Sequence, residues 1–382
     1  MVHHMANLCV GYQRDDYPER RNITNLAFPG IKHQLAPDSN ADVPSEFLDF
    51  VNSKGWASRY VASPAPNHNI DLYHYFNSIP VSDVKFISTF ESSLPRWWGA
   101  SQQIWQRGFD ILAGPNCRAL IAMSQNAALI QEELYKMFPD ISDKQAIQKK
   151  IYIVHPPQEI DYKRHKFAKF EHPKVQITFI GRDFLRKGGY EFIKSVDKLN
   201  KKNIKFDATI VSPLITFNND SRWNDKAEEK LNETKVLINS LDIEYFPSLN
   251  NEAVLDLLSR SHAYVLPSFH DTYGFSVIEA QSVGCPVVCT DQRSFPELNS
   301  NDIGWILPTE KDSCGQINSK DEAAFLRNSD MLVQSLTEKI AEIVQHPEIV
   351  KLKAIQSIER IKKEHDPYQY SLKIAELYRK GS

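Results

Sequence analysis

Short apolar runs alternate with segments of helical spacing through the second half of the chain, and no other feature constrains its fold as much. The alternation predicts strands that are each followed by a helix, joined by right-handed β-α-β connections into a parallel sheet. Sheets of this kind bind ligands beyond the carboxyl ends of their strands. The predicted strands are 175–180, 206–211, 243–246, 263–266, 286–290 and 305–307, and the predicted helices are 190–199, 252–258 and 275–283.

The first half of the chain carries the same alternation more weakly. Residues 1–65 are rich in Pro, Asn and Asp and show no clear period. The charged stretch 161–173 predicts a linker between two domains, and residues 367–378 have the apolar spacing of a terminal helix. The predicted elements of the first half are the strands 72–76, 84–88, 119–123 and 151–154 and the helix 126–137.

Length and composition limit the possible classes of function. A chain of 382 residues is too long for one hydrophobic core and suits two domains. Its net charge of −3 gives no general attraction to nucleic acid. It contains no apolar run near the roughly 20 residues of a membrane-spanning helix, and its first residues lack the pattern of a signal peptide. We therefore expect a cytoplasmic protein, with a peripheral contact at the inner face of the membrane left open.

The 5 cysteines are an odd number, and only Cys285 and Cys289 lie close together in the sequence. On one strand these two would be roughly 13 Å apart, too far for a disulfide. No second Cys or His pair stands at the spacing of a zinc site. The pattern favours reduced, buried thiols in a reducing compartment and predicts no metal site.

Residues 181–189, GRDFLRKGG, form the first motif that can carry chemistry. The motif lies between a predicted strand and a predicted helix, where glycine lets the backbone turn tightly and approach a ligand. Arg182 offers a planar fork for phosphate oxygens, and Lys187 offers a mobile positive charge. Backbone amides at the start of the next helix add attraction for an anion. The glycine spacing fits neither GxGxxG nor the Walker A loop, and a basic surface turn is the alternative interpretation.

The second motif lies in residues 267–291. Asp271 and Glu279 are separated by Gly274, where a helix should begin. Glu279 falls inside an apolar helix and would point inward or toward a ligand, because a buried carboxylate without a partner is costly. The alternative is a surface Glu279 and an Asp271 that caps the helix. Since both motifs open at the same strand ends of a parallel sheet, we expect them to face one ligand.

With these residues, the segment 174–310 resembles the C-terminal, nucleotide-sugar-binding domain of retaining glycosyltransferases of family four, the group 1 type. The resemblance implies the α/β GT-B fold, in which two Rossmann-like domains face each other across a cleft. It implies an N-terminal acceptor domain over 1–165, a donor domain over 166–365, and a helix over 366–382 that crosses back to the first domain. The matching positions are Gly181-Arg182, Lys187-Gly188, the run from Asp271 to Glu279, GCPVV at 284–288, and Pro296-Glu297.

By this resemblance, Arg182 and Lys187 would hold the donor diphosphate, Glu279 would accept from the ribose hydroxyls, and Asp271 would contact the donor sugar. The family usually carries Glu where this chain has Asp271, which is one methylene shorter. The other residues expected to bind the donor are Gly181, Tyr273, Gly274 and Phe275.

The first half resembles the family less closely. Glu91 stands where many members carry a His near the sugar, so Glu91 joins Arg182, Lys187, Asp271 and Glu279 in the expected catalytic group. Trp97 or Trp98 could stack on an acceptor sugar, because the C–H faces of sugars pack on aromatic rings. The alternative is that both tryptophans belong to the core.

The resemblance therefore predicts a retaining glycosyltransferase for polysaccharide biosynthesis. Such an enzyme moves a sugar from a nucleoside-diphosphate sugar to a carbohydrate or glycolipid acceptor and needs no cofactor. No Asp-x-Asp pair lies in a plausible loop, so we expect a metal-independent reaction. Three alternatives stay open: a non-hydrolysing sugar-nucleotide epimerase, a non-catalytic protein that binds nucleotide sugars, and a carbohydrate phosphorylase. The last would need a pyridoxal lysine, for which the chain shows no candidate.

Overall fold

The chain forms two compact units, each containing a parallel sheet. Unit 1 comprises residues 1–157 and 365–382, and unit 2 comprises residues 158–364. The boundary expected between 165 and 166 falls on residues outside those that the structure describes. The computed structural model describes residues 8–37, 43–54, 57–65, 67–138, 141, 143–164, 167–171, 174–215, 226–318 and 322–382.

Unit 2 is built on a six-stranded, all-parallel sheet with the strand order β11-β10-β9-β12-β13-β14. The chain starts in the middle at β9 and proceeds to one edge, then returns to β12 and proceeds to the other edge. The order therefore reverses between β9 and β12, which is where doubly wound sheets bind ligands. The strands are β9 Gln176–Ile180, β10 Asp207–Val211, β11 Glu244–Phe246, β12 Ala263–Leu266, β13 Val287–Thr290 and β14 Trp305–Leu307. All six strands predicted for this half are present within one residue at each end.

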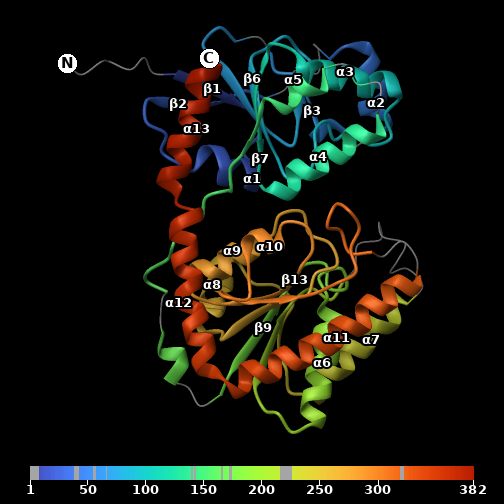
Figure 1. Ribbon diagram of the computed structural model, residues 1–382, viewed down its shortest axis with the longest axis vertical. Helices are drawn as coiled ribbons and strands as arrows, with labels where there is room; N and C mark the ends of the chain where they lie inside the picture. Colours follow the sequence, from blue (N-terminus) through green and yellow to red (C-terminus); the bar gives the residue numbers. More distant parts are fainter. Residues whose placement is uncertain are drawn as a thin grey trace, which may run out of the picture. The chain divides into compact units, whose positions relative to one another are not determined.

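Helices cover both faces of this sheet (Figure 1). One face carries α6, α7 and α11, whose apolar side chains join one core cluster with the strands. The other face carries α8, α9 and α12. The helices of unit 2 are α6 Gly189–Lys201, α7 Ala227–Ser240, α8 Asn251–Arg260, α9 Phe275–Ser282, α10 Phe295–Leu298, α11 Glu322–Gln345 and α12 Pro347–Glu364.

Helices α7, α10, α11 and α12 were not predicted from the sequence. In α11 the signal is present, because Leu332, Leu336, Ile340 and Ile343 repeat at helical spacing and are all buried. In α7 the pattern is weak, since Ala227, Thr234 and Ile238 are its only buried residues.

Unit 1 also contains a six-stranded parallel sheet, with the order β2-β1-β4-β6-β7-β8. Its first two strands lie in the region where the sequence showed no clear period. Strand β6 begins two residues later than predicted, because residues 81–83 form a bend and residues 84 and 85 are irregular. The strands are β1 Leu8–Tyr12, β2 Ile31–Leu35, β4 Leu72–Phe76, β6 Phe86–Phe90, β7 Cys117–Ala122 and β8 Ile151–Ile153, and β3 Val61–Ala62 pairs separately with β5 Ile79–Pro80.

In the described part of unit 1, five α-helices precede its last strand. The apolar side chains of α2, α3, α4 and α5 pack on one face of the sheet. Ser101 and Ser124 start α3 and α4 by accepting the backbone N–H of Ile104 and Ala127. The helices are α1 Tyr17–Glu19, α2 Ser45–Ser53, α3 Gln102–Ala113, α4 Gln125–Met137 and α5 Lys144–Gln148.

The opposite face of this sheet is covered by α13, Pro367–Gly381, the last helix of the chain (Figure 1, red). Asp366 caps it by accepting the backbone N–H of Gln369 at 2.7 Å. Tyr378 anchors it, because its hydroxyl lies 2.7 Å from Nδ1 of the fully buried His74 on β4. The other ring nitrogen of His74 lies 2.8 Å from the hydroxyl of Thr89 on β6. The two segments of the sequence that make up unit 1, 1–157 and 365–382, therefore contact each other in its core.

The cysteines of the described chain are all free thiols. Cys117, Cys285 and Cys289 are buried, as expected, whereas Cys9 and Cys314 are half-buried. Burial raises the pKa of the Cys289 thiol to about 12. Among the described helices, none has the length and apolar character needed to cross a bilayer.

The burial of His74 and His33 predicts a specific loss of stability in acid. Burial lowers the pKa of His74 to about 3 and that of His33 to about 4. Below the ordinary histidine pKa of about 6.5, these two histidines bind protons in the unfolded chain but not in the folded chain. The free energy of unfolding should therefore fall as the pH drops from about 6.5 toward 4, by up to about 1.4 kcal/mol per pH unit for each histidine.

His33→Gln should reduce this slope, as measured by urea denaturation at a series of pH values. His68→Gln, which changes an exposed histidine of the same unit, is the control and should leave the slope unchanged. Identical slopes in the wild type and both variants would contradict the prediction.

Candidate functional site

Two loops of unit 2 meet where the strand order reverses. Residues 181–189 follow β9, and residues 267–274 follow β12, which pairs directly with β9. The loops are joined by backbone, since the N–H of Phe269 donates to the carbonyl of Arg186 at 3.0 Å. The two motifs singled out in the sequence therefore lie side by side at the carboxyl edge of the sheet.

Lys187 and Asp271 form an ion pair across the two loops. Lys187 Nζ lies 2.5 Å from Asp271 Oδ2, and both side chains are largely buried, with 17% and 16% exposed. Burial raises the pKa of Asp271, but the Lys187 ammonium, the nearby Arg186 and the N–H of Thr272 lower it further, to below its ordinary value. The carboxylate is therefore held ionised beside a cation, in a place that is shielded from water.

Arg186 braces the same two loops, a role that sequence reasoning missed. Its Nε donates to the buried carboxylate of Asp183 at 2.9 Å, and its Nη1 donates to the carbonyl of His270 at 3.0 Å. The motif was interpreted through Arg182 and Lys187 alone, although Asp and Arg three residues apart can pair within one turn. Arg182 itself is exposed. Of the three cations in the loop, Arg186 therefore has a structural role, and Lys187 is the one that reaches Asp271.

Two glycines make the close approach of these loops possible. Gly188 has a φ of 78°, and a Cβ there would lie 2.2 Å from the carbonyl oxygen of Pro267. Gly274 has a φ of 102°, and a Cβ there would lie 2.6 Å from the ring of Phe295. Both positions combine a left-handed backbone with contact too close for any side chain.

Helix α9 begins beside the pair, directly after Gly274, as the sequence predicted. Its first turn is positioned by the hydroxyl of Tyr264, which lies 3.3 Å from Ser276 Oγ and donates to the carbonyl of Ile180 at 3.1 Å. The amides at this end of α9 provide positive potential for an anion. Glu279 lies one turn into the helix and is half-buried, so neither a deeply buried nor a fully exposed carboxylate is found.

The aromatic residues at the start of α9 have different surroundings. Tyr273 is buried, and Phe275 is half-buried with its ring 5.2 Å from that of Tyr273. The backbone carbonyl of Tyr273 accepts the hydroxyl of Ser294 at 2.5 Å. The side chain of Tyr273 therefore packs in the interior below the loop, whereas the ring of Phe275 is partly accessible to solvent.

In unit 1, Glu91 follows β6 at the carboxyl edge of that sheet. Its Oε2 accepts from Nδ2 of Asn77 at 3.0 Å and lies 3.5 Å from Arg96 Nη1. Asn77 follows the neighbouring strand β4 and also accepts the backbone N–H of Glu91 at 3.0 Å. The carboxylate is therefore oriented by residues from its own unit at the edge where a parallel sheet binds ligands.

The two tryptophans expected to contact an acceptor are unlike each other. Trp97 is wrong as a stacking residue, because it is 0% exposed and its Nε1 donates to the carbonyl of Tyr60 at 3.0 Å. Its ring packs edge-on against Phe47. Trp98, in contrast, is 45% exposed. Adjacent residues in an irregular segment point in different directions, and the sequence has no period there to show which ring faces inward.

Comparisons with known proteins show what the segment that carries these two loops is similar to. Residues 161–319 match the family model described as glycosyl transferases group 1. The O-antigen chain mannosyltransferase B of Escherichia coli is 36% identical over 56 residues, which is 15% of each chain. The chain spans only 15% and 34% of the lengths of the two curated relatives that it matches.

Solved structures extend the likeness to both units. A glycosyltransferase from Rickettsia africae has a TM-score of 0.61 at 14% identity and covers 98% of both chains. An Anabaena protein solved in complex with UDP and glucose has a TM-score of 0.56 at 11% identity, with 96% of this chain and 98% of that one covered. At these identities the likeness shows the fold, and the predicted α/β GT-B architecture is confirmed.

Gly188 generates a prediction that has a matched control within the chain. Gly99 also has a positive φ, 81°, but a Cβ there would meet nothing closer than 3.7 Å. Gly99→Ala should therefore cost about 1 kcal/mol of unfolding free energy, the backbone penalty alone. Gly188→Ala should cost on the order of 3 kcal/mol or more, because it adds a clash with Pro267. Chemical denaturation measures both, and equal losses would contradict the close approach of the loops.

Proposed function

Because residues 161–319 match the model of the group 1 glycosyl transferases, we propose that this protein is a retaining, metal-independent glycosyltransferase. It moves a sugar from a nucleoside-diphosphate sugar to a carbohydrate or glycolipid acceptor. The observation that carries the proposal is the Lys187–Asp271 pair at the strand-order reversal of unit 2, beside the start of α9. The pair supplies a shielded cation and a carboxylate, and the start of α9 adds backbone amides. A sugar diphosphate can bind to such a combination, with its phosphates at the cation and amides and its sugar hydroxyls at the carboxylate.

This geometry and the family resemblance support each expected donor contact. The diphosphate binds between Lys187, Arg182 and the amides at the start of α9, where positive potential gathers. The Asp271 carboxylate, which Lys187 keeps ionised, accepts a hydrogen bond from a hydroxyl of the donor sugar. Glu279 is half-buried one helical turn from Gly274, and it accepts from the ribose hydroxyls.

The reaction makes the anomeric carbon more cationic and the departing diphosphate more negative. Lys187 and the helix amides are already in place, so they stabilise the growing negative charge without reorganisation. A divalent metal performs this role in other enzymes. The cations of residues 182–187 make that metal unnecessary here. The incoming acceptor hydroxyl bonds to the anomeric carbon as the bond from that carbon to the diphosphate breaks, and the hydroxyl proton passes to the departing phosphate oxygen.

Unit 1 provides the acceptor side in this proposal. Glu91 is oriented by Asn77 and Arg96 at the carboxyl edge of its sheet, and it accepts from a hydroxyl of a bound sugar. We assign the acceptor domain to the residues before 158 together with the helix over 366–382. The donor domain then comprises unit 2, from Gln158 to Glu364.

Nucleoside diphosphate should bind without a metal, and Glu279 should contribute to its binding. In buffer with excess EDTA, one of UDP, GDP and ADP should raise the melting temperature, since a ligand at 100 times its Kd stabilises by roughly 2.7 kcal/mol. Glu279→Ala should weaken that binding by roughly 1.5–3 kcal/mol, as for hydrogen bonds to a charged group. Calorimetry measures the affinity, with Glu228→Ala as a control at an exposed carboxylate on α7, outside both motifs. Binding that requires Mg²⁺, or an unchanged affinity in Glu279→Ala, would contradict the assignment.

Lys187 should matter more for the transition state than for donor binding. Lys187→Ala should lower kcat on the order of 10²–10³-fold, with a smaller rise in the donor KM. Because the variant leaves Asp271 unpaired, it should also lose stability. The double variant Lys187→Ala/Asp271→Asn should recover stability, and its kcat should lie below that of Asp271→Asn alone, which measures the loss due to Asp271. Lys194→Ala, which breaks the more exposed pair with Glu233, should preserve both.

Steady-state kinetics and denaturation on these variants separate catalysis from folding. If the double variant and Asp271→Asn have the same kcat, Lys187 only supports the structure. A rise in KM with unchanged kcat would show uniform binding of the donor. Conversion of the free donor in the absence of any acceptor would instead identify an epimerase.

A further inference from the structure

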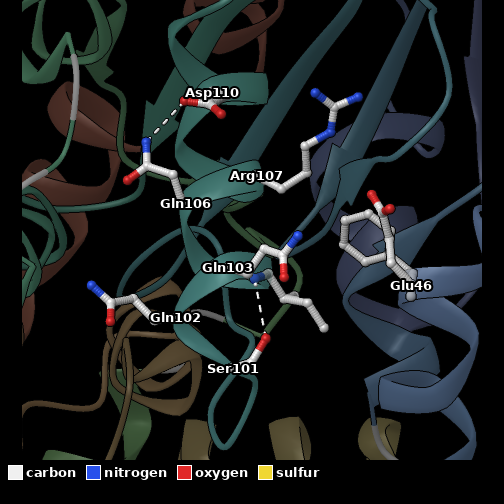
Figure 2. A pocket seen from close by; sticks show the side chains of 9 residues that line it. Glu46, Ser101, Gln102, Gln103, Gln106, Arg107 and Asp110 are labelled. Carbon is white, nitrogen blue, oxygen red and sulfur yellow. Dashed lines mark hydrogen bonds between the residues drawn. The ribbon is translucent and has the colours of Figure 1, made fainter.

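Two adjoining hollows lie on unit 1 along the first turns of α3. The larger, of about 680 Å³, lies between α3 and the start of α2 (Figure 2). The smaller, of about 340 Å³, lies between α3 and the last turn of α4. Both are lined by Gln102 and Gln106, so they form one continuous surface, here named the α3 groove. Together they have the size of a site for a small ligand of a few rings.

The larger hollow is lined mainly by planar polar groups. Figure 2 shows Gln103 and Arg107 on the side of α3 that faces Glu46, and Gln102 and Gln106 on its other side. The carboxamides of the three glutamines each offer a donor and an acceptor. Gln106 donates to Asp110 at 2.9 Å. The lining also holds two carboxylates, Glu46 and Asp110, and one guanidinium, Arg107, so its formal net charge is −1.

The side chains of the larger hollow are available to a ligand. Glu46, Gln102, Gln103 and Arg107 are exposed, and within the described chain no hydrogen bond or ion pair holds their side chains. A surface that offers both donors and acceptors with little charge complements hydroxyl groups. It does not complement a phosphate, because only one cation is present.

The smaller hollow adds aromatic surface. Trp105 lines it, and the ring of Trp98 lies 5.3 Å from that of Trp105 in an edge-on contact. Trp98 is 45% exposed, although tryptophan is usually largely buried. Trp105 packs in turn against Phe109 and Phe138, which keeps the exposed ring on a rigid support. Trp98 itself lines neither hollow, but it contacts the lining residue Trp105 and therefore presents an exposed ring next to the groove.

We propose that the α3 groove binds a neutral oligosaccharide. The C–H faces of a sugar ring pack against Trp98, and its hydroxyls exchange hydrogen bonds with Gln102, Gln103 and Arg107. The identification of this oligosaccharide with the acceptor rests on the proposed function, whereas the binding itself does not. The near-neutral lining argues against an anionic membrane surface or a nucleic acid, which both require several cations.

The test is direct binding by the full chain without any donor. The neutral trisaccharides maltotriose, mannotriose and chitotriose serve as probes in saturation-transfer NMR and calorimetry. At least one should bind. Trp98→Ala and Gln103→Ala/Arg107→Ala should each weaken binding by roughly tenfold or more. Tyr368→Ala is the matched control, because it removes an exposed aromatic ring from α13 of the same unit, and it should leave the affinity unchanged.

Three outcomes would overturn the proposal. None of the trisaccharides binds, or the groove variants bind as well as the wild type while circular dichroism shows them folded. Alternatively, only phosphatidylglycerol vesicles bind, and Trp98→Ala abolishes that binding, which would assign the groove to a membrane surface. Titration of nucleoside diphosphate into the same samples reports on unit 2 separately. Loss of trisaccharide binding with intact nucleotide binding therefore contradicts the groove and not the transferase.

Discussion

The ion pair between Lys187 and Asp271 is the interaction on which the site of unit 2 depends. It joins the loops that follow β9 and β12, at the point where the strand order of the sheet reverses. A carboxylate this shielded requires a cation, and the cation requires a turn that brings it within 2.5 Å. Gly188 permits that turn, and Arg186 holds it through Asp183 and the carbonyl of His270. The turn at Gly188, the hydrogen bonds of Arg186 and the Lys187–Asp271 ion pair therefore depend on one another.

Unit 1 depends on a different kind of contact, between residues that are far apart in the sequence. Tyr378 on the last helix meets His74 on β4, which in turn meets Thr89 on β6. These groups are fully enclosed, so each must be paired with another polar atom. The last helix thereby becomes part of the core of unit 1, packed against the sheet that precedes Glu91.

The strands of unit 2 could be predicted closely because most of their residues are buried, with β11 at the edge as the exception. Strands such as 263–266 are continuous apolar runs that end at Pro or Gly, and their limits are visible in the sequence. The strands of unit 1 before residue 65 were missed, since β2 is only partly buried and carries polar residues. Helix α11 was not predicted although its apolar residues repeat at helical spacing, whereas the apolar residues of α7 show little of that spacing.

The sequence by itself determined the parallel α/β class and the two motifs, because residue type and spacing act locally. Glycine at 188 and 274, and charges at 187 and 271, are local properties of the chain. Only the tertiary structure decided which groups meet. It paired Lys187 with Asp271 across 84 positions, assigned Arg186 to bracing, buried Trp97 and left Trp98 exposed. Such choices depend on how separate elements pack, and packing is a property of the whole fold that no single segment encodes.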